Sequence, residues 1–114
     1  MLPEKNQLRT WNDRDGMFLV LDVIEDRVVI ANGKYKEYAH LSDVIQKSNT
    51  TDAVKIGELR HWSISSTQSD GHTFIVVCIR SDARGGIVCD ILDRGNLYAI
   101  SLGSLLLVSE LLNR

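Results

Sequence analysis

The chain has 114 residues, of which 44% are apolar and 25% are charged, and its formal net charge is −2 at pH 7. These values are typical of a soluble globular protein, and they argue against a protein that coats nucleic acid through bulk positive charge. The length fits one ordinary domain or two very small ones. A unit of about 55 residues is near the lower size limit for folding alone, so we expect two halves that share an interface.

The sequence contains an internal repeat. Three segments of the first half return in the second half in the same order: Leu8–Trp11 as Leu59–Trp62, 18–23 as 74–79, and Tyr38-Ala39 as Tyr98-Ala99. The offset between matched residues grows along the chain, as it does when insertions lengthen the loops of a duplicated module. Solenoids and propellers need about three or more copies. The repeat therefore predicts two small barrel-like modules, 1–50 and 51–114, that arose by internal duplication.

The first half is predicted to consist of three strands joined by tight turns. Residues 17–24 are too short for a typical helix and rich in β-formers, so we expect a strand. The strand 28–31 returns, and Asn32-Gly33 is a strong hairpin signal because both residues tolerate positive φ. Residues 34–39 alternate as a half-exposed third strand does, and 41–45 form a turn of helix or a short closing strand.

The second half repeats this order. We expect strands at 73–80, 87–92 and 97–101, after a Ser/Thr-rich insert at 63–69. A short C-terminal helix is predicted over 104–112, with Ser104 as its N-cap. The whole chain is therefore predicted to be all-β, with a short helical C-terminal segment.

One face of the central strand in each half is predicted to be the core. Because side chains alternate across a strand, the core face carries these residues: Leu19, Leu21, Val23, Ile75, Val77 and Ile79. The opposite face carries a second apolar stripe, which makes its members candidate interface residues: Phe18, Val20, Phe74 and Val76. An exposed apolar stripe of this size is a poor surface for a soluble monomer. We predict that protein covers it, either the sister module, a second chain or the segment 105–108.

Residues 14–34 carry a family resemblance. Gly16 precedes an apolar strand, an acidic turn follows at 25–26, and a second apolar strand leads to Asn32-Gly33 and Lys34. This order resembles the KOW segment of SH3-like barrels, most closely that of the short KOW-type ribosomal-like proteins of bacteria. The resemblance implies two tandem SH3-like modules and a role in binding RNA or a ribonucleoprotein. RNA-binding relatives usually follow the hairpin with a lysine-rich stretch, whereas residues 35–40 here contain one lysine.

Basic and aromatic residues interleave at several places, as they do where proteins stack bases and contact phosphates. The candidate nucleic-acid-binding residues are Arg9, Trp11, Arg14, Lys34, Tyr35, Lys36, Arg60 and His61. An alternative interpretation applies to the two tryptophans, Trp11 and Trp62. A Leu-x-x-Trp pattern that occurs once in each half also fits a core anchor for each module.

The sequence contains no recognisable catalytic or metal-binding pattern. The three histidines are scattered, and no cysteine or histidine pair has the spacing of metal ligands. Cys78 and Cys89 lie in apolar runs, so we expect small buried thiols, with a cross-strand disulfide as the alternative. No signal peptide or run of membrane-spanning length is recognisable, so we expect a cytoplasmic protein that does not interact with membranes.

These observations predict a non-enzymatic protein–protein interaction or adaptor module that self-associates or inhibits its partner. The expected partner is another protein or a second copy of the chain. The alternative is a KOW-like protein that binds RNA or a ribonucleoprotein. We expect no cofactor, no metal and no catalytic residue.

Overall fold

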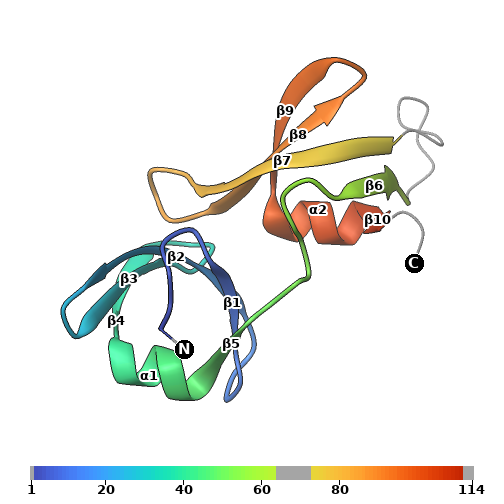
Figure 1. The fold of residues 1–114 in the computed structure, drawn as a ribbon. Helices are drawn as coiled ribbons and strands as arrows, with labels where there is room; N and C mark the ends of the chain where they lie inside the picture. Colours follow the sequence, from blue (N-terminus) through green and yellow to red (C-terminus); the bar gives the residue numbers. More distant parts are fainter. Residues whose placement is uncertain (1, 64–72, 112–114) are drawn as a thin grey trace. The chain divides into compact units, whose positions relative to one another are not determined.

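The structure of the protein, a computed structural model, describes residues 2–63 and 73–111 (Figure 1). These residues are mostly β-strand, with two short helices. The chain divides into two compact units, of which the first holds Met1–Asp52 and Arg80–Ile87, and the second holds Ala53–Ile79 and Val88–Arg114. The Ser/Thr-rich insert predicted at 63–69 lies outside the described residues from residue 64 onward.

The first unit is built on a five-stranded antiparallel sheet in the order β4-β3-β2-β1-β5 (Figure 1). Its elements are β1 (Leu8–Trp11), β2 (Met17–Ile24), β3 (Arg27–Ala31), β4 (Lys36–His40), α1 (Leu41–Lys47) and β5 (Ser48–Thr50). The three predicted strands are confirmed, and the helical alternative for residues 41–45 is the right one. The hairpin at Asn32-Gly33 is also confirmed, although only Gly33 has a positive φ (99°).

The other five-stranded antiparallel sheet, in the order β10-β6-β7-β8-β9, belongs to the second unit except for the end of β7 and the first residue of β8. Its elements are β6 (Leu59–Trp62), β7 (Thr73–Ser81), β8 (Ile87–Asp93), β9 (Asn96–Ser101), α2 (Leu102–Val108) and β10 (Ser109–Leu111). Read from β9 to β10, this order is the same as that of the first sheet. β2 and β7 therefore take the same place, as their matched sequences predicted. Within the described ranges neither sheet closes into a barrel, because β4 and β9 remain edge strands.

The core of the first unit lies on the face of the sheet that carries Phe18 and Val20. These two side chains are fully buried with Val28, Ile30 and Val44. Three partly buried apolar residues pack against this cluster: Trp11, Ala39 and Leu41. Burying a side chain such as Phe18 stabilises the fold by about 1.5–3 kcal/mol. The predicted stripe is thus covered by protein, but the cover comes from its own unit, including Val44 of α1, and the interface predicted at Phe18 and Val20 is corrected to a core.

The predicted core face was wrong because Phe18 and Val20, which precede a β-bulge in β2, already face the core. Val20 pairs with Ile30 and Asp22 pairs with Val29, so Leu21 is an extra residue in β2. The bulge breaks the strict alternation on which the prediction relied. Leu19 is buried as predicted, but Leu21 is only half-buried and Val23 is 36% exposed.

The second unit has the same kind of core. Phe74 and Val76 are buried there, so the interface predicted at these two residues is likewise corrected to a core. The other buried apolar side chains of its strands and helix include Cys89, Ile91, Leu102 and Leu105. Of the predicted core face, Ile79 is buried, Ile75 is half-buried and Val77 is 37% exposed. The apolar face with a phenylalanine at its start is therefore the inner one in both halves.

The C-terminal helix begins earlier than the sequence indicated. α2 starts at Leu102, and its N-cap is Ser101, whose side chain accepts a hydrogen bond from the Ser104 N–H (3.2 Å). Ser104 had been predicted as the cap, but it stands at the third helical position. The helix ends where the Ser109 hydroxyl donates to the Leu105 carbonyl (2.5 Å). In the first unit the Ser48 hydroxyl donates to the Val44 carbonyl in the same way.

Candidate functional site

Arg9, predicted to bind nucleic acid, is a buried structural residue. It is 6% exposed. Its Nε donates to Ser48 Oγ (2.8 Å), its Nη2 donates to the Ser48 carbonyl (2.9 Å), and its Nη1 donates to Gln7 Oε1 (2.8 Å). Burial disfavours the charged form, so the pKa of Arg9 is lowered from its ordinary value. These bonds fasten β1 to the junction of α1 and β5.

Arg60 makes the same set of contacts in the second unit. It is buried, its Nε donates to Ser109 Oγ (2.8 Å), and its Nη2 donates to the Ser109 carbonyl (3.2 Å). Its Nη1 donates to Glu58 Oε2 (2.7 Å), where Arg9 uses Gln7. The donors of both guanidinium groups are engaged inside the protein, which favours a structural role for Arg9 and Arg60 over the predicted phosphate contacts.

The tryptophans lie against the cores. The Trp11 ring centroid is 4.5 Å from that of Phe18, and the guanidinium carbon of Arg14 lies 4.5 Å above the same ring. Arg14 also forms an ion pair with Asp13 (3.1 Å). Trp11 is thus engaged by both the core residue Phe18 and the side chain of Arg14. The core-anchor interpretation fits this geometry better than a free stacking platform for bases.

Trp62 repeats the core contact. Its ring centroid is 4.5 Å from that of Phe74, and its Nε1 donates to Asp93 Oδ2 (3.3 Å). Its neighbour His61 is half-buried, and the Nε2 of His61 lies 3.7 Å from a carboxylate oxygen of Glu110. Among the described residues, Arg60 is therefore buried and both Trp62 and His61 have partners within their own unit.

The hairpin residues Lys34, Tyr35 and Lys36 are exposed as predicted, with Tyr35 57% exposed. The side chain of Asn32 sets the shape of this turn, because its Oδ1 accepts from the backbone N–H groups of Lys34 (2.9 Å) and Tyr35 (3.0 Å). Of the eight candidate residues for nucleic acid, these three and Arg14 are exposed.

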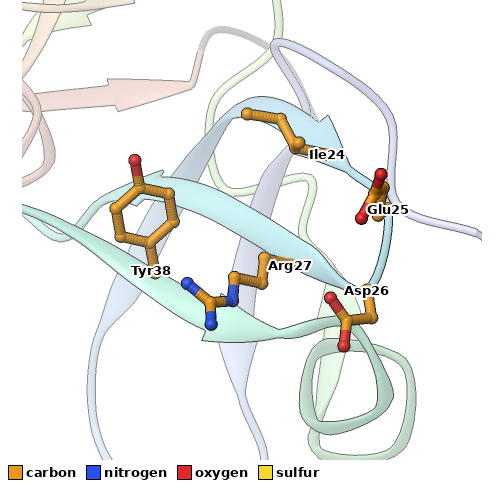
Figure 2. Close-up of a pocket in the computed structure, with 5 residues that line it drawn as sticks. All are labelled: Ile24, Glu25, Asp26, Arg27 and Tyr38. Atoms are coloured by element: carbon orange, nitrogen blue, oxygen red, sulfur yellow. The ribbon is translucent and has the colours of Figure 1, made fainter.

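A shallow pocket that the sequence did not reveal lies at the turn between β2 and β3 (Figure 2). It has a volume of about 420 Å³ and is lined by Ile24, Glu25, Asp26, Arg27 and Tyr38. The Arg27 guanidinium carbon is 6.0 Å from the centroid of the Tyr38 ring, at the outer limit of a cation–π contact. The Leu41 N–H donates to the Asp26 carbonyl (2.8 Å), which ties the turn to the start of α1.

The pocket belongs to a larger surface on the outer side of the sheet, which we call the tyrosine face. In the strand register Ile24 lies opposite Arg27, and Arg27 lies opposite His40. Alternation along β4 places Lys36 and Tyr38 on the same side as His40. Tyr38 is 65% exposed. The tyrosine face thus consists of Ile24, Arg27, Lys36, Tyr38 and His40, and a second hollow of about 130 Å³ beside Arg27, Tyr38, Ala39 and His40 extends it.

The tyrosine face has no counterpart in the second unit. Tyr38 lies opposite Val29, whereas Tyr98 lies opposite the buried Ile91, on the inner side of its sheet. The predicted match of Tyr38-Ala39 with Tyr98-Ala99 is therefore out of register by one residue. Counted back from the first residue of the following helix, the residue that stands at the place of Tyr38 is Ala99.

The tyrosine face combines an aromatic ring, an aliphatic side chain and cations with two adjacent carboxylates. Burial raises the pKa of the Cys89 thiol to about 11, so this group is no nucleophile at neutral pH. Within residues 2–63 and 73–111 no three His, Cys, Asp or Glu side chains gather into a group that could hold a metal ion. Among the same residues no helix has the length and apolar character needed to cross a membrane.

Comparison of the chain with protein-family models, with curated proteins and with solved structures gave no match. The site must therefore be interpreted from its own geometry.

Proposed function

We propose that the chain is a non-enzymatic protein–protein interaction module made of two SH3-like modules that arose by internal duplication. Three observations support this architecture. The two sheets have the same strand order, a short helix joins the fourth strand to the fifth in each, and the buried contacts of Arg9 with Ser48 recur at Arg60 with Ser109.

The tyrosine face is the proposed binding site for a segment of a partner protein. The observation that carries the proposal is the open Tyr38 ring beside Arg27, over a hollow whose wall includes the aliphatic Ile24 (Figure 2). Tyrosine and arginine are the residue types that most often dominate the binding energy of protein interfaces. The bond from Leu41 to Asp26 holds the turn in place, so little ordering cost is expected on binding.

The charges at the pocket favour a protein partner over RNA. Glu25 and Asp26 line the same hollow as Arg27. Carboxylates beside the binding cation repel a phosphate backbone, whereas a polypeptide can offer a lysine or an amide to them. The burial of Arg9 and Arg60 removes two more cations from the surface that could meet phosphates.

RNA binding is the second candidate, and the exposed hairpin favours it. Lys34 and Lys36 flank Tyr35, which offers a base-stacking ring between two cations. The KOW resemblance of residues 14–34 points to the same class of ligand. A cytoplasmic location belongs to both versions of the proposal, and the free thiols of Cys78 and Cys89 are consistent with it.

Two tyrosine variants test the proposal. Tyr38→Ala removes the ring from the pocket, and Tyr35→Ala removes an exposed ring that does not line it. The full-length protein and both variants are immobilised and exposed to the native lysate. We expect a set of proteins that wild type and Tyr35→Ala retain and that Tyr38→Ala loses.

RNA binding is measured with the same three proteins over a range of salt concentrations. Affinity that falls steeply with salt and is lost in Tyr35→Ala would establish the RNA alternative, since phosphate contacts release counterions. Identical protein capture by wild type and Tyr38→Ala would overturn the proposed site.

A further inference from the structure

The strand β9 is an edge strand with an unusual composition. Its six residues, Asn96–Ser101, include no charged side chain, and in the described part of the chain its only strand partner is β8. Leu97 is 68% exposed, and its cross-strand neighbour Leu92 is exposed as well. A long, uncharged edge with exposed apolar side chains is a template for pairing with a further strand.

The equivalent edge of the first unit is protected against such pairing. β4 carries Lys36 and Glu37 in its five residues. Lys36 and Leu97 stand the same number of residues before the following helices, which begin at Leu41 and Leu102. Charged side chains, lysine above all, are the usual means by which proteins block edge-to-edge association. The second unit has leucine at the place where the first has lysine.

We propose that β9 pairs antiparallel with β9 of a second copy of the chain, so that two sheets join across a twofold axis into one ten-stranded sheet. The absence of charge argues for this occupant. In a twofold antiparallel pair each strand meets its own sequence, so any charge on it would face a like charge or lie close to one. A register centred on Tyr98 sets Leu97 opposite Ala99 of the other copy and the two Tyr98 rings side by side. This contact is separate from the tyrosine face.

The pairing forms main-chain hydrogen bonds along the free side of β9 and removes exposed apolar surface from water. Three charged groups lie close to β9: Asp90, half-buried on β8 beside Ala99, the buried Asp93 opposite Asn96, and Arg94 in the preceding turn. None of them lies on the pairing strand. Six residues form a small interface, so the dimer is expected to be in reversible equilibrium with the monomer.

The test measures molecular mass as a function of protein concentration, by sedimentation velocity on the full chain. Wild type should shift from the 12.8 kDa monomer toward twice that mass as concentration rises. Leu97→Lys installs the charge that β4 carries at the same place, and we expect it to weaken the dimer at least about tenfold, or ~1.4 kcal/mol. Leu107→Lys is the matched control, since Leu107 lies on α2 and is 77% exposed. It should leave the association unchanged.

Amide hydrogen exchange locates the contact without a substitution. Protection of residues 96–101 should increase with protein concentration, while that of residues 36–40 should stay constant. A wild-type protein that stays monomeric up to ~1 mM, the range of a very weak complex, overturns the proposal, and so does a dimer that Leu97→Lys leaves intact. Association lost in Tyr38→Ala but not in Leu97→Lys would place self-association at the tyrosine face instead.

Discussion

Removal of the Arg9 guanidinium is expected to unfold the first unit. Arg9→Ala deletes three hydrogen bonds of 2.8 to 2.9 Å from a charged donor and removes the guanidinium partner of the buried Ser48. Removing one partner of a buried charged network costs about 3–5 kcal/mol. A unit of about 60 residues has a total stability of about 3–9 kcal/mol, so the variant loses most of it.

Urea denaturation followed by tryptophan fluorescence measures this loss. The chain has two tryptophans, one in each unit, so a Trp62→Phe background makes Trp11 the reporter of the first unit. With a slope of about 1 kcal/mol per M for so small a unit, the midpoint should fall by about 3–5 M or the folded baseline should vanish. Arg14→Ala is the control, because this exposed arginine makes only surface contacts worth about 1 kcal/mol or less.

The reasoning is refuted if Arg9→Ala and Arg14→Ala have the same midpoint. An Arg9→Ala protein that keeps its stability but loses affinity for RNA would restore Arg9 as a phosphate ligand. The prediction therefore separates the sequence-based role of this residue from the one that its burial indicates.

Three further predictions follow from the packing and the turns. Phe18→Ala should cost about 3–5 kcal/mol in urea denaturation, whereas Val23→Ala should cost less than about 1 kcal/mol, and equal costs would mean that the inner face is misassigned. Gly85→Ala should destabilise the first unit, because a Cβ at this positive-φ residue (105°) would lie 2.1 Å from the Tyr35 carbonyl carbon, and an unchanged midpoint would contradict that close approach. Backbone N–H groups of residues 86, 84 and 85 donate to Asp82 and lower the pKa of its carboxyl. These bonds should stabilise the turn fully at pH values above the pKa of Asp82 in the unfolded chain. The stabilisation should be lost as the pH falls through the lower pKa of Asp82 in the folded protein. An NMR titration of Asp82 at or above the ordinary carboxyl value would contradict this.

The sequence predicted the elements better than the faces. Strand positions followed from short β-rich runs between turn residues, and the repeat predicted that β2 and β7 take the same place in their sheets. The inner face was misassigned because both faces of β2 begin with apolar residues, so the binary pattern does not distinguish them. The inner face is set by a tertiary contact that only the fold shows, in which Val44 of α1 packs in one cluster with Phe18.

The candidate site was partly predictable. Alternation along residues 36–40 was enough to place Lys36, Tyr38 and His40 on one face. The role of Arg9 was not predictable, because a basic residue next to aromatic ones looks the same in sequence whether it binds a phosphate or a serine in the core. The signal that could have found it is the recurrence of Ser48 as Ser109, which follows each short helix at the same distance.

The two units differ most where their side chains meet solvent. The buried positions match in kind: Phe18 corresponds to Phe74 in strand order, and Arg9 to Arg60 in its contacts with a serine. The edge strands β4 and β9 do not match in this way. Lys36 of β4 corresponds to Leu97 of β9, and Tyr38 corresponds to Ala99. A core constrains both units equally, because any loss of packing there costs stability. Exposed edge positions carry no such constraint, and their divergence fits the two separate roles proposed above, one for a charged aromatic face and one for an uncharged pairing strand.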